Sequence, residues 1–219
     1  MFAAIAGRYD LVNRVLSGGR DLSWRRVAVR MAGLRGGESV LDVCCGTGDF
    51  ALLFAARKPA SVTGLDFTPE MLRIAKDRAA RAGAPIDWLA GDALRLPFAD
   101  ACFDVVSVGY GVRNIQDLDA GLRELARVLR PGGRVVILDC TPARGLIGKA
   151  ANFYINRVIP WVGNRLSGSK DRAYSYLADS IKVFPDCTEL QRRMEAAGFK
   201  EVRWRKLNMG TMAIHAGAH

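Results

Sequence analysis

Hydrophobic residues are spaced along this chain with two different periods. Short apolar runs rich in β-branched residues predict buried strands, and apolar residues three or four positions apart predict helices. The strands are expected at residues 39–43, 62–66, 86–90, 103–108 and 134–140, and the helices between them at 49–57, 70–81 and 117–129. Strands and helices that alternate in this way favour a parallel sheet with helices on both faces.

The end of the chain shows the same patterns in a different order. A helix is expected at residues 188–197, with Gly198 as its cap, because glycine readily takes the left-handed conformation that ends many helices. Two strands are expected at 201–207 and 211–216, joined by Asn208-Met209-Gly210 as a hairpin. His215 lies in the apolar second strand, and we interpret it as a structural residue.

Two glycines one residue apart, Gly46 and Gly48, follow the first predicted strand and precede a predicted helix. Glycine has no Cβ, so such a turn brings bare backbone N–H groups close to a ligand. In a doubly wound sheet, nucleotide-like cofactors bind at this position. A lone Gly-x-Gly is equally typical of an ordinary turn, so the neighbouring residues have to decide.

Carboxylates at the ends of the next two strands favour a cofactor. Asp66 ends the second strand about 20 residues after the glycines, the spacing that places an acid on a ribose. A capping role at the helix that begins near Pro69 is the alternative, and the two roles are compatible. Asp92 follows the third strand in the same way.

Four segments together resemble the class I S-adenosylmethionine-dependent methyltransferases. They are D-V-C-C-G-T-G-D at 42–49, G-L-D-F-T-P-E-M-L at 64–72, G-D-A-L-R-L-P-F at 91–98 and L-R-P-G-G-R at 129–134. NAD-binding enzymes usually have a third glycine, in G-x-G-x-x-G, where this chain has G-T-G-D-F-A. The resemblance implies S-adenosyl-L-methionine as the cofactor. It also implies an α/β, Rossmann-like fold with a mostly parallel seven-stranded sheet, one antiparallel strand and helices on both faces.

Segments outside this core resemble the ubiquinone/menaquinone biosynthesis C-methyltransferases. They are Y-D-L-V-N at 9–13 with W-R-R at 24–26, G-V-R-N at 111–114, Y-S-Y-L-A-D-S-I at 174–181 and M-G-T-M-A-I-H at 209–215. The resemblance implies C-methylation of a polyprenylated quinol precursor, with demethylmenaquinol as the expected acceptor. Two alternatives stay open. One is a methyltransferase for another small molecule, such as a ubiquinone or phylloquinone precursor or a secondary metabolite, and the other is a binding protein without catalysis.

Methylation of a ring carbon requires alignment and a way to remove a proton. A sulfonium donor already carries an activated methyl group, and a quinol ring becomes a carbon nucleophile when a hydroxyl loses its proton. Neither a metal nor a cysteine or serine nucleophile is required. Arg113 is the candidate to stabilise the phenolate, because it is a permanent cation with a fixed fork of donors. The alternative is a salt bridge with Asp117 or Asp119 at a helix start.

The resemblance assigns further roles to residues of the site. Arg113 would polarise a water that serves as base, and Asn114 would orient that water. Tyr9 belongs to an N-terminal segment expected to close over the site, with a packing role as its alternative. The cofactor-binding candidates are Thr47 with Gly46 and Gly48 for the methionine moiety, Asp66 for both ribose hydroxyls, Asp92 and Ala93 for the adenine, Asp49 for the amino group, Asp42 as support of the loop, and Phe67 and Gly109 beside them.

Two positions depart from the family pattern. Cys44-Cys45 stands where many members have Ala-Gly or Gly-Gly, and Gly109 stands where many carry a serine that touches the cofactor. We interpret the adjacent cysteines as small packing residues rather than a redox or metal pair. Five cysteines without a C-x-x-C spacing favour a reduced cytoplasmic setting.

The net charge of +10 is unevenly distributed. Residues 1–39 carry +4, residues 40–141 carry −1, residues 142–182 carry +5 and the remainder carries +2. Nucleic acid is one partner for a basic protein, but no recognition motif is present and aromatic residues do not alternate with the charges. An anionic membrane surface explains the pattern better, and we expect peripheral contact with it. No stretch approaches the length of a membrane span, and residues 1–19 lack the sustained apolar run of a secretory signal.

The length predicts a single domain. We divide it into four parts by sequence pattern and resemblance. These are an N-terminal helical cap at 1–38, a cofactor-binding core at 39–141, an insertion at 142–183, and a C-terminal helix with a strand hairpin at 184–219. Residues 145–162 of the insertion mix apolar and aromatic residues with scattered cations. This segment is expected to face the membrane or to hold a polyprenyl tail. The alternative is a helix that packs against the core or across a homodimer interface.

Overall fold

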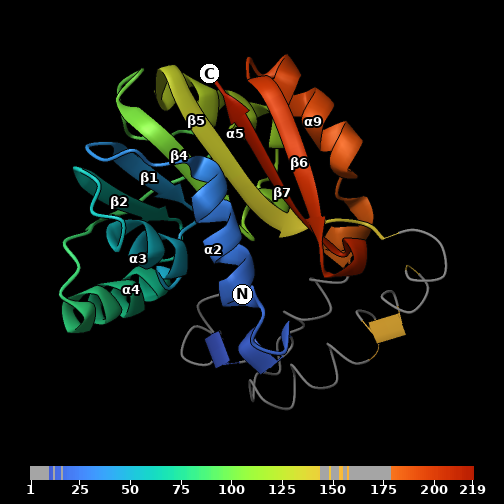
Figure 1. The fold of residues 1–219 in the computed structure, drawn as a ribbon, viewed down its shortest axis with the longest axis horizontal. Coiled ribbons are helices and arrows are strands. Elements are labelled where there is room, and N and C mark those ends of the chain that lie inside the picture. The colour runs from blue at the N-terminus through green and yellow to red at the C-terminus, as the bar shows by residue number, and fades with distance from the viewer. Residues whose placement is uncertain are drawn as a thin grey trace.

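The computed structural model describes residues 10–11, 13–15, 17–143, 148, 153–154, 157 and 179–219. Tyr9 and most of the segments 145–162 and 174–181 lie outside the described residues. Within the described part, seven strands form one sheet in the order β3-β2-β1-β4-β5-β7-β6 (Figure 1).

Six strands of the sheet run in one direction and the seventh runs against them. The parallel set is β1 (Ser39–Val43), β2 (Ser61–Asp66), β3 (Asp87–Ala90), β4 (Phe103–Gly109), β5 (Leu129–Cys140) and β6 (Lys200–Leu207). β7 (Met212–Ala218) pairs antiparallel with both β5 and β6. The expected fold class is therefore confirmed. Most predicted boundaries differ by one or two residues, and the largest error is at β5. This strand begins at Leu129 rather than Arg134, because Leu129 pairs with Phe103 before a break in the register.

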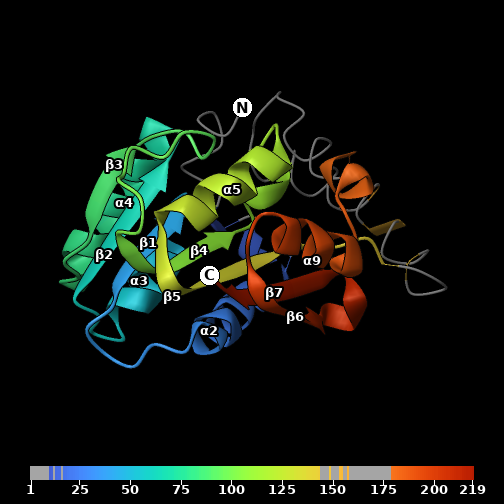
Figure 2. The same cartoon turned by 90° about the horizontal axis from the view of Figure 1, so that it is seen from above.

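Helices cover both faces of the sheet (Figure 2). α2 (Asp21–Ala32) and α3 (Asp49–Ala55) pack on one face, where their residues Ala28, Phe50 and Phe54 join a buried apolar core. α5 (Leu118–Val128) and α9 (Cys187–Ala196) pack on the other, where Leu122 and Leu190 join a second core. α4 (Pro69–Ala82) packs against β2 and β3. Phe50, Leu122 and Leu190 thus belong to helices that the sequence pattern predicted, whereas α2 was expected only as part of a helical cap.

Local signals fix where the helices begin and end. α4 starts with Pro69 in its first turn and is followed by Gly83 at φ +61°. Asp117 caps α5, since its carboxylate accepts a hydrogen bond from the N–H of Ala120. Asp186 does the same for the N–H of Glu189 in α9. Each of these elements was predicted to within about two residues, as expected where pattern and cap agree.

The carboxyl ends of the strands meet at one edge of the sheet. β1 leads there into the glycine turn, β2 ends at Asp66, and β4 ends at Gly109 followed by the 3₁₀ turn η1 (Val112–Asn114). β7 starts at the same edge, because Met212 pairs with Cys140 at the end of β5. Two short turns and five strand ends therefore surround one location. None of the helices in the described ranges has the length and apolarity to cross a bilayer.

Candidate functional site

The turn between β1 and α3 has a left-handed backbone at three positions. The φ angles are +54° at Cys44, +56° at Gly46 and +86° at Gly48. A Cβ at Gly46 would meet no atom within 4 Å, so this residue faces open space. A Cβ at Gly48 would lie 2.6 Å from the Trp88 ring, so this glycine is also required by packing.

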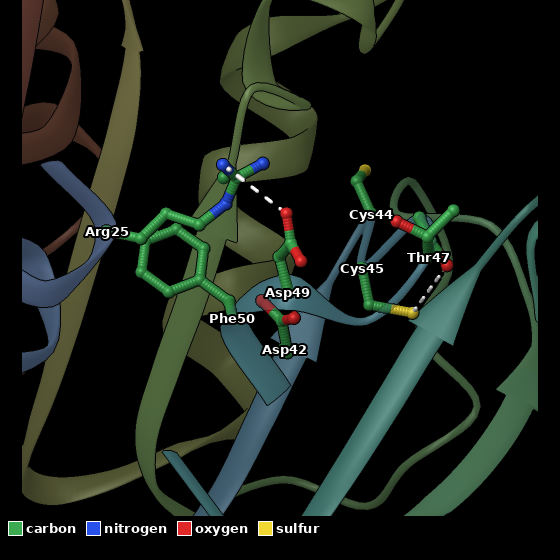
Figure 3. A pocket seen from close by; sticks show the side chains of 9 residues that line it. Arg25, Asp42, Cys44, Cys45, Thr47, Asp49 and Phe50 are labelled. Carbon is green, nitrogen blue, oxygen red and sulfur yellow. Dashed lines mark hydrogen bonds and ion pairs between the residues drawn. The ribbon is translucent and has the colours of Figure 1, made fainter. Parts of the chain in front are cut away.

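A pocket opens beside this turn (Figure 3). Its walls come from α2, the glycine turn, the start of α3 and the end of β4. The lining residues are Arg25, Asp42, Cys44, Cys45, Gly46, Thr47, Asp49, Phe50 and Gly109. The structure thus brings together five predicted cofactor residues, and it adds Arg25 and Phe50, which the sequence interpretation missed.

Asp66 is fixed to the glycine turn by its carboxylate. Oδ2 accepts the N–H of Gly46 at 2.8 Å and Oδ1 accepts the N–H of Thr68 at 2.8 Å. Burial raises the pKa of Asp66, although these two N–H groups oppose the shift. A carboxylate oxygen can accept two hydrogen bonds. Each oxygen of Asp66 therefore keeps acceptor capacity for one hydroxyl of a ribose. The capping alternative was wrong in detail, because Thr68 is the N-cap of α4 and Asp66 binds the N–H of Thr68 rather than an N–H inside the helix.

Asp42 is buried beneath the turn. Its Oδ1 accepts the Ser107 hydroxyl at 2.7 Å and its Oδ2 accepts the N–H of Ala51 at 3.1 Å. Burial raises the pKa of Asp42 to about 7, against the opposing effect of these bonds and of Arg25. The carboxylate links β1 to β4 and to the start of α3, and it can change its charge near neutral pH.

Asp49 lies among three arginines. Its carboxylate is 2.5 Å from Arg78 Nη2, 3.6 Å from Arg25 Nη1 and 3.6 Å from Arg14 Nη2. Burial by itself would raise the pKa of Asp49, but Arg25, Arg78 and Arg14 outweigh it and hold the pKa below its ordinary value. Asp49 is therefore ionised at neutral pH.

The N-terminal segment also reaches the glycine turn. The Thr47 hydroxyl donates to Asp10 at 2.6 Å, and Arg78 Nη1 donates both to Asp10 at 3.0 Å and to the Thr47 carbonyl at 2.7 Å. Arg78 of α4 thus links the N-terminal segment at Asp10 to the glycine turn at Thr47. Neither Asp10 nor Arg78 was predicted as a site residue, because they lie 37 and 31 residues from Thr47 in the sequence.

Asp92, Ala93 and Phe67 lie outside the pocket lining, after the neighbouring strands. Asp92 is exposed and its Oδ1 accepts the N–H of Leu94 at 2.9 Å, while Ala93 is buried. Phe67 follows Asp66 directly and is 76% exposed. An aromatic ring this exposed beside a partly buried carboxylate has a free face on which a planar ligand can stack.

Arg113 and Asn114 lie in η1, the turn that follows β4. Arg113 Nη1 is 2.5 Å from Asp139 Oδ1 and 2.9 Å from the carbonyl of Tyr110, and Asn114 Nδ2 donates to that same carbonyl at 3.4 Å. The Oδ1 atom of Asn114 is buried and has no hydrogen-bond partner among the described residues. Asp117 and Asp119, the partners in the alternative interpretation, make other contacts: Asp117 caps α5, and Asp119 is 3.3 Å from Arg193.

Tyr110 connects this turn to the pocket. Its backbone is left-handed, with φ +60°, and its N–H donates to the Leu138 carbonyl at 2.7 Å. The guanidinium of Arg25 lies 4.7 Å from the centre of the Tyr110 ring, a cation–π distance. The Tyr110 ring therefore contacts Arg25 in the pocket wall, and the Tyr110 carbonyl accepts hydrogen bonds from both Arg113 and Asn114.

The two departures from the family pattern have packing explanations. A Cβ at Gly109 would lie 2.3 Å from the Phe50 ring, so the aromatic ring occupies the space of a side chain there. Cys44 packs toward Gly111 and Cys45 toward Gly64, and their side chains point in opposite directions (Figure 3). Burial raises the pKa of both thiols. They behave as packing residues.

The charges of the pocket select the kind of ligand that fits. Asp42, Asp49 and Asp66 are carboxylates at or near its wall, which oppose a phosphate and favour a cation. Arg25 adds one positive group to the lining, 3.6 Å from Asp49 and 2.9 Å from Asp21. A ribose, a sulfonium, an amino group and a carboxylate match this set, and those are the groups of S-adenosylmethionine. The site therefore fits this cofactor better than a dinucleotide.

Solved structures show the same fold at low sequence identity. The [4+2]-cyclase SpnF has a TM-score of 0.70 and 20% identity, over 90% of this chain and 80% of that chain. A possible histamine N-methyltransferase from Thermotoga maritima has a TM-score of 0.67 and 18% identity, over 100% and 99%. These matches establish the architecture only, since one of the two proteins is a cyclase.

Sequence relatives are much closer. A demethylmenaquinone methyltransferase of Thermus thermophilus is 46% identical over 219 residues, covering 99% of both chains. A ubiquinone/menaquinone biosynthesis C-methyltransferase UbiE of Desulfotalea psychrophila is 46% identical, covering 99% of this chain and 88% of its own. The model of the ubiE/COQ5 methyltransferase family matches residues 1–219. With the glycine turn, the strand-end carboxylates and the G-V-R-N turn in place, this chain belongs to the ubiE/COQ5 methyltransferase family.

Proposed function

We propose that this protein transfers a methyl group from S-adenosylmethionine to a ring carbon of a polyprenylated quinol precursor, with demethylmenaquinol as the acceptor. The observation that carries the proposal is the position of Arg113 and Asn114. Both are fixed to the Tyr110 carbonyl in the turn directly after Gly109, which lines the cofactor pocket. Relatives named as demethylmenaquinone methyltransferases, 46% and 45% identical over nearly the whole chain, support the choice of acceptor.

The described residues can hold each part of the cofactor. Asp66 would accept both ribose hydroxyls, while Asp92 and the backbone of Ala93 would bind the adenine edge, with Phe67 beside it. Arg25 pairs with the carboxylate of the methionine moiety, and Asp49 attracts its ammonium group. The turn at Gly46 allows close approach of the backbone, because nothing lies within 4 Å of its Cβ position. When bound, this cofactor supplies a methyl group on a positively charged sulfur, which is already electrophilic.

Arg113 and Asn114 act on the acceptor. A phenolate oxygen beside the Arg113 guanidinium would be stabilised by charge and by hydrogen bonds, so the hydroxyl loses its proton more readily. The ring carbon next to a phenolate oxygen is a stronger nucleophile than the same carbon of the neutral phenol. The Oδ1 of Asn114, a buried acceptor without a partner among the described residues, can orient a water that takes the hydroxyl proton. The low exposure of the Arg113 side chain, 8%, strengthens these interactions by keeping bulk water away.

The N-terminal segment contributes to closure of the site. Asp10 bonds to Thr47 at 2.6 Å, so the chain immediately next to Tyr9 is attached to the glycine turn. This attachment supports the proposal that Tyr9 closes over the bound ligands. A test is the replacement Tyr9→Phe against Tyr9→Ala, since closure requires the ring and acid–base chemistry would require the hydroxyl.

We further propose that the protein works in the cytoplasm in peripheral contact with an anionic membrane. The excess positive charge lies outside residues 40–141, where the cofactor binds. A polyprenylated acceptor resides in a bilayer, so a surface attracted to anionic lipid brings the site to its substrate. Self-association as a homodimer stays a prediction.

The test is a panel of acceptors offered with radiolabelled S-adenosylmethionine. It contains short-tailed demethylmenaquinol, a demethoxy-type ubiquinol precursor, a phylloquinone precursor and a simple phenol, each kept reduced. The expected result is the highest kcat/KM with demethylmenaquinol. Preference for another quinol precursor would move the assignment within the family, and transfer to none of them with intact cofactor binding would overturn it.

A further inference from the structure

The outer edge of the sheet at β6 carries an unusual concentration of positive charge. Within β6, Lys200, Arg203, Arg205 and Lys206 are exposed, and Glu201 is the single acid. β6 is the last strand in the sheet order, so one of its edges has no neighbouring strand among the described residues (Figure 1). Long basic side chains on such an edge can extend beyond the sheet from both of its faces.

These cations differ from those on the adjacent helix. On α9, Arg192 pairs with Glu189 at 2.8 Å and Arg193 pairs with Glu189 at 3.2 Å and with Asp119 at 3.3 Å. In the part of the chain that the structure describes, no ion pair involves any of the four cations of β6. The arginines of α9 are thus neutralised by nearby carboxylates, whereas the exposed cations of β6 are available to bind an anionic partner.

Two large apolar side chains are exposed along the same element. Trp204 is 38% exposed, donates from Nε1 to Gln191 at 3.0 Å, and lies 5.6 Å from the Lys206 ammonium group. Met209, in the turn η3 (Asn208–Gly210) that joins β6 to β7, is 75% exposed. An amphipathic tryptophan, a protruding methionine and several cations are the side chains that favour a bilayer interface.

This element also lies at the edge of the sheet where the site is. The turn η3 leads into Met212, which pairs with Cys140, and the Thr141 N–H donates to the Thr211 carbonyl at 3.0 Å. Asp139, the partner of Arg113, is in register with Ala213 of β7. The turn η3 therefore lies at the same edge of the sheet as the Arg113–Asn114 turn, so a membrane in contact with η3 would be near the site.

We propose that β6 and the turn η3 form the surface by which the protein docks on an anionic lipid bilayer, with the site's edge of the sheet toward the lipid. The inference rests on the proposed function for its purpose, the delivery of a polyprenylated acceptor. Its evidence is separate, because unpaired cations of one sign match anionic headgroups and exposed Trp204 and Met209 match the interface.

Other occupants explain the element less well. Charges on an edge strand discourage pairing with other sheets, but that purpose is served by either sign and needs no exposed tryptophan or methionine. A second copy paired edge to edge would bring like charges together across the new interface. A nucleic acid would satisfy the cations alone, and it enters the experiment as a competing ligand.

The experiment is sedimentation with two kinds of vesicle at low salt: pure phosphatidylcholine, and phosphatidylcholine with 30 mol% phosphatidylglycerol. We expect the full chain to bind only the anionic vesicles. Combined replacement of Arg203→Gln, Arg205→Gln and Lys206→Gln should lower the partition coefficient about 10- to 100-fold. The matched control is Arg73→Gln, Lys76→Gln and Arg81→Gln on α4, which removes the same charge near the opposite edge of the sheet and should lower binding less than about threefold.

Equal loss in both triple variants would mean that only net charge matters, and no loss in either would mean that β6 is not the surface. Either result overturns the inference, as does binding to duplex DNA in place of vesicles. Unfolding midpoints and turnover with a short-tailed, water-soluble quinol should stay unchanged in both variants. If the wild-type chain methylates no quinol but still binds vesicles through β6, the proposed function fails while the docking surface stands.

Discussion

Arg113 and Asp139 form a buried ion pair, with 2.5 Å between Nη1 and Oδ1, that joins the turn after β4 to the end of β5. The same carboxylate accepts the backbone N–H of Arg113 at 3.2 Å through Oδ2. One acidic residue thus fixes both the position of the arginine in the chain and the direction of its guanidinium. The exposed fractions of the two side chains are 8% and 2%, so solvent does little to weaken the pair.

The first prediction concerns this pair. Replacing Asp139→Asn keeps the shape but removes the charge that aligns the guanidinium, so kcat should fall about 100-fold. Replacing Arg113→Lys should have a similar effect, because an ammonium group lacks the planar fork. The dissociation constant for S-adenosylmethionine, measured by calorimetry, should change less than about threefold in both variants. Lost cofactor affinity with normal turnover of the saturated enzyme would show that the pair has been assigned to the wrong step.

The second prediction concerns Arg25. If Arg25 pairs with the carboxylate of the cofactor, replacing Arg25→Gln should weaken S-adenosylmethionine about 10- to 100-fold, the range of a charge-assisted hydrogen bond. Turnover at saturating cofactor should change far less. The matched control is Arg26→Gln, the next residue of α2, which is exposed. Equal effects of the two replacements on affinity would argue against a direct contact.

The third prediction explains Gly109. Since a Cβ there would lie 2.3 Å from the Phe50 ring, Gly109→Ser should lower the free energy of unfolding by about 1–3 kcal/mol. A second replacement, Phe50→Leu, should recover part of this loss, because the smaller side chain makes room. Urea unfolding of the two single variants and the double variant measures the coupling. Strictly additive effects would show that the ring does not exclude the serine.

The fourth prediction is a pH dependence that originates in Asp42. The ordinary carboxyl pKa is 3.8 and burial raises that of Asp42 to about 7, so between these values the folded chain holds a proton that the unfolded chain has lost. Without cofactor, the contribution of Asp42 to stability is therefore fully present below pH 3.8 and is lost as pH rises through about 7. His215 acts in the opposite sense, since burial lowers its pKa and its contribution is lost as pH falls. The free energy of unfolding is measured against pH for the wild-type chain and for Asp42→Asn, and the difference between the two curves gives the contribution of Asp42.

Cofactor binding should shift Asp42 from the protonated form, which burial favours, to the ionised form. A ligand with a sulfonium and an ammonium group favours the ionised carboxylate, so binding below pH 7 should release up to one proton and affinity should rise between about pH 6 and 8. Calorimetry in two buffers with different ionisation enthalpies measures the released proton. The Asp42→Asn variant should release none, and an unchanged proton release in that variant would assign the titration to another group.

Much of the fold could be predicted from the sequence because its signals are local. Apolar runs predicted the strands, and Pro69, Gly83 and Asp117 mark helix ends to within about two residues. The glycine turn and Asp66 were predictable for the same reason, because a strand end and a fixed spacing define both. Tyr9 and the insertion lie outside the described residues, so the expectations for them remain predictions.

The rest of the site depends on contacts between distant segments. Arg25 comes from a helix before β1, and Asp139 lies 26 residues after Arg113. Proximity in sequence suggested Asp117 or Asp119 as the alternative salt-bridge partner of Arg113. The ion pair in the structure is with Asp139. The rule that parallel strands end at one edge could have indicated Asp139, since it is the carboxylate at the end of the strand next to β4. No sequence pattern indicates that Phe50 packs on Gly109.

The most direct test of the proposed reaction is the position of the transferred methyl group. The full chain is incubated with S-adenosylmethionine carrying a ¹³C-methyl group and with reduced short-tailed demethylmenaquinol, and the product is examined by NMR. We predict a ¹³C-methyl bonded to a ring carbon, formed with the quinol and absent with the oxidised quinone. A methyl on a ring oxygen, or no transfer while S-adenosylmethionine still binds in the pocket, would contradict it.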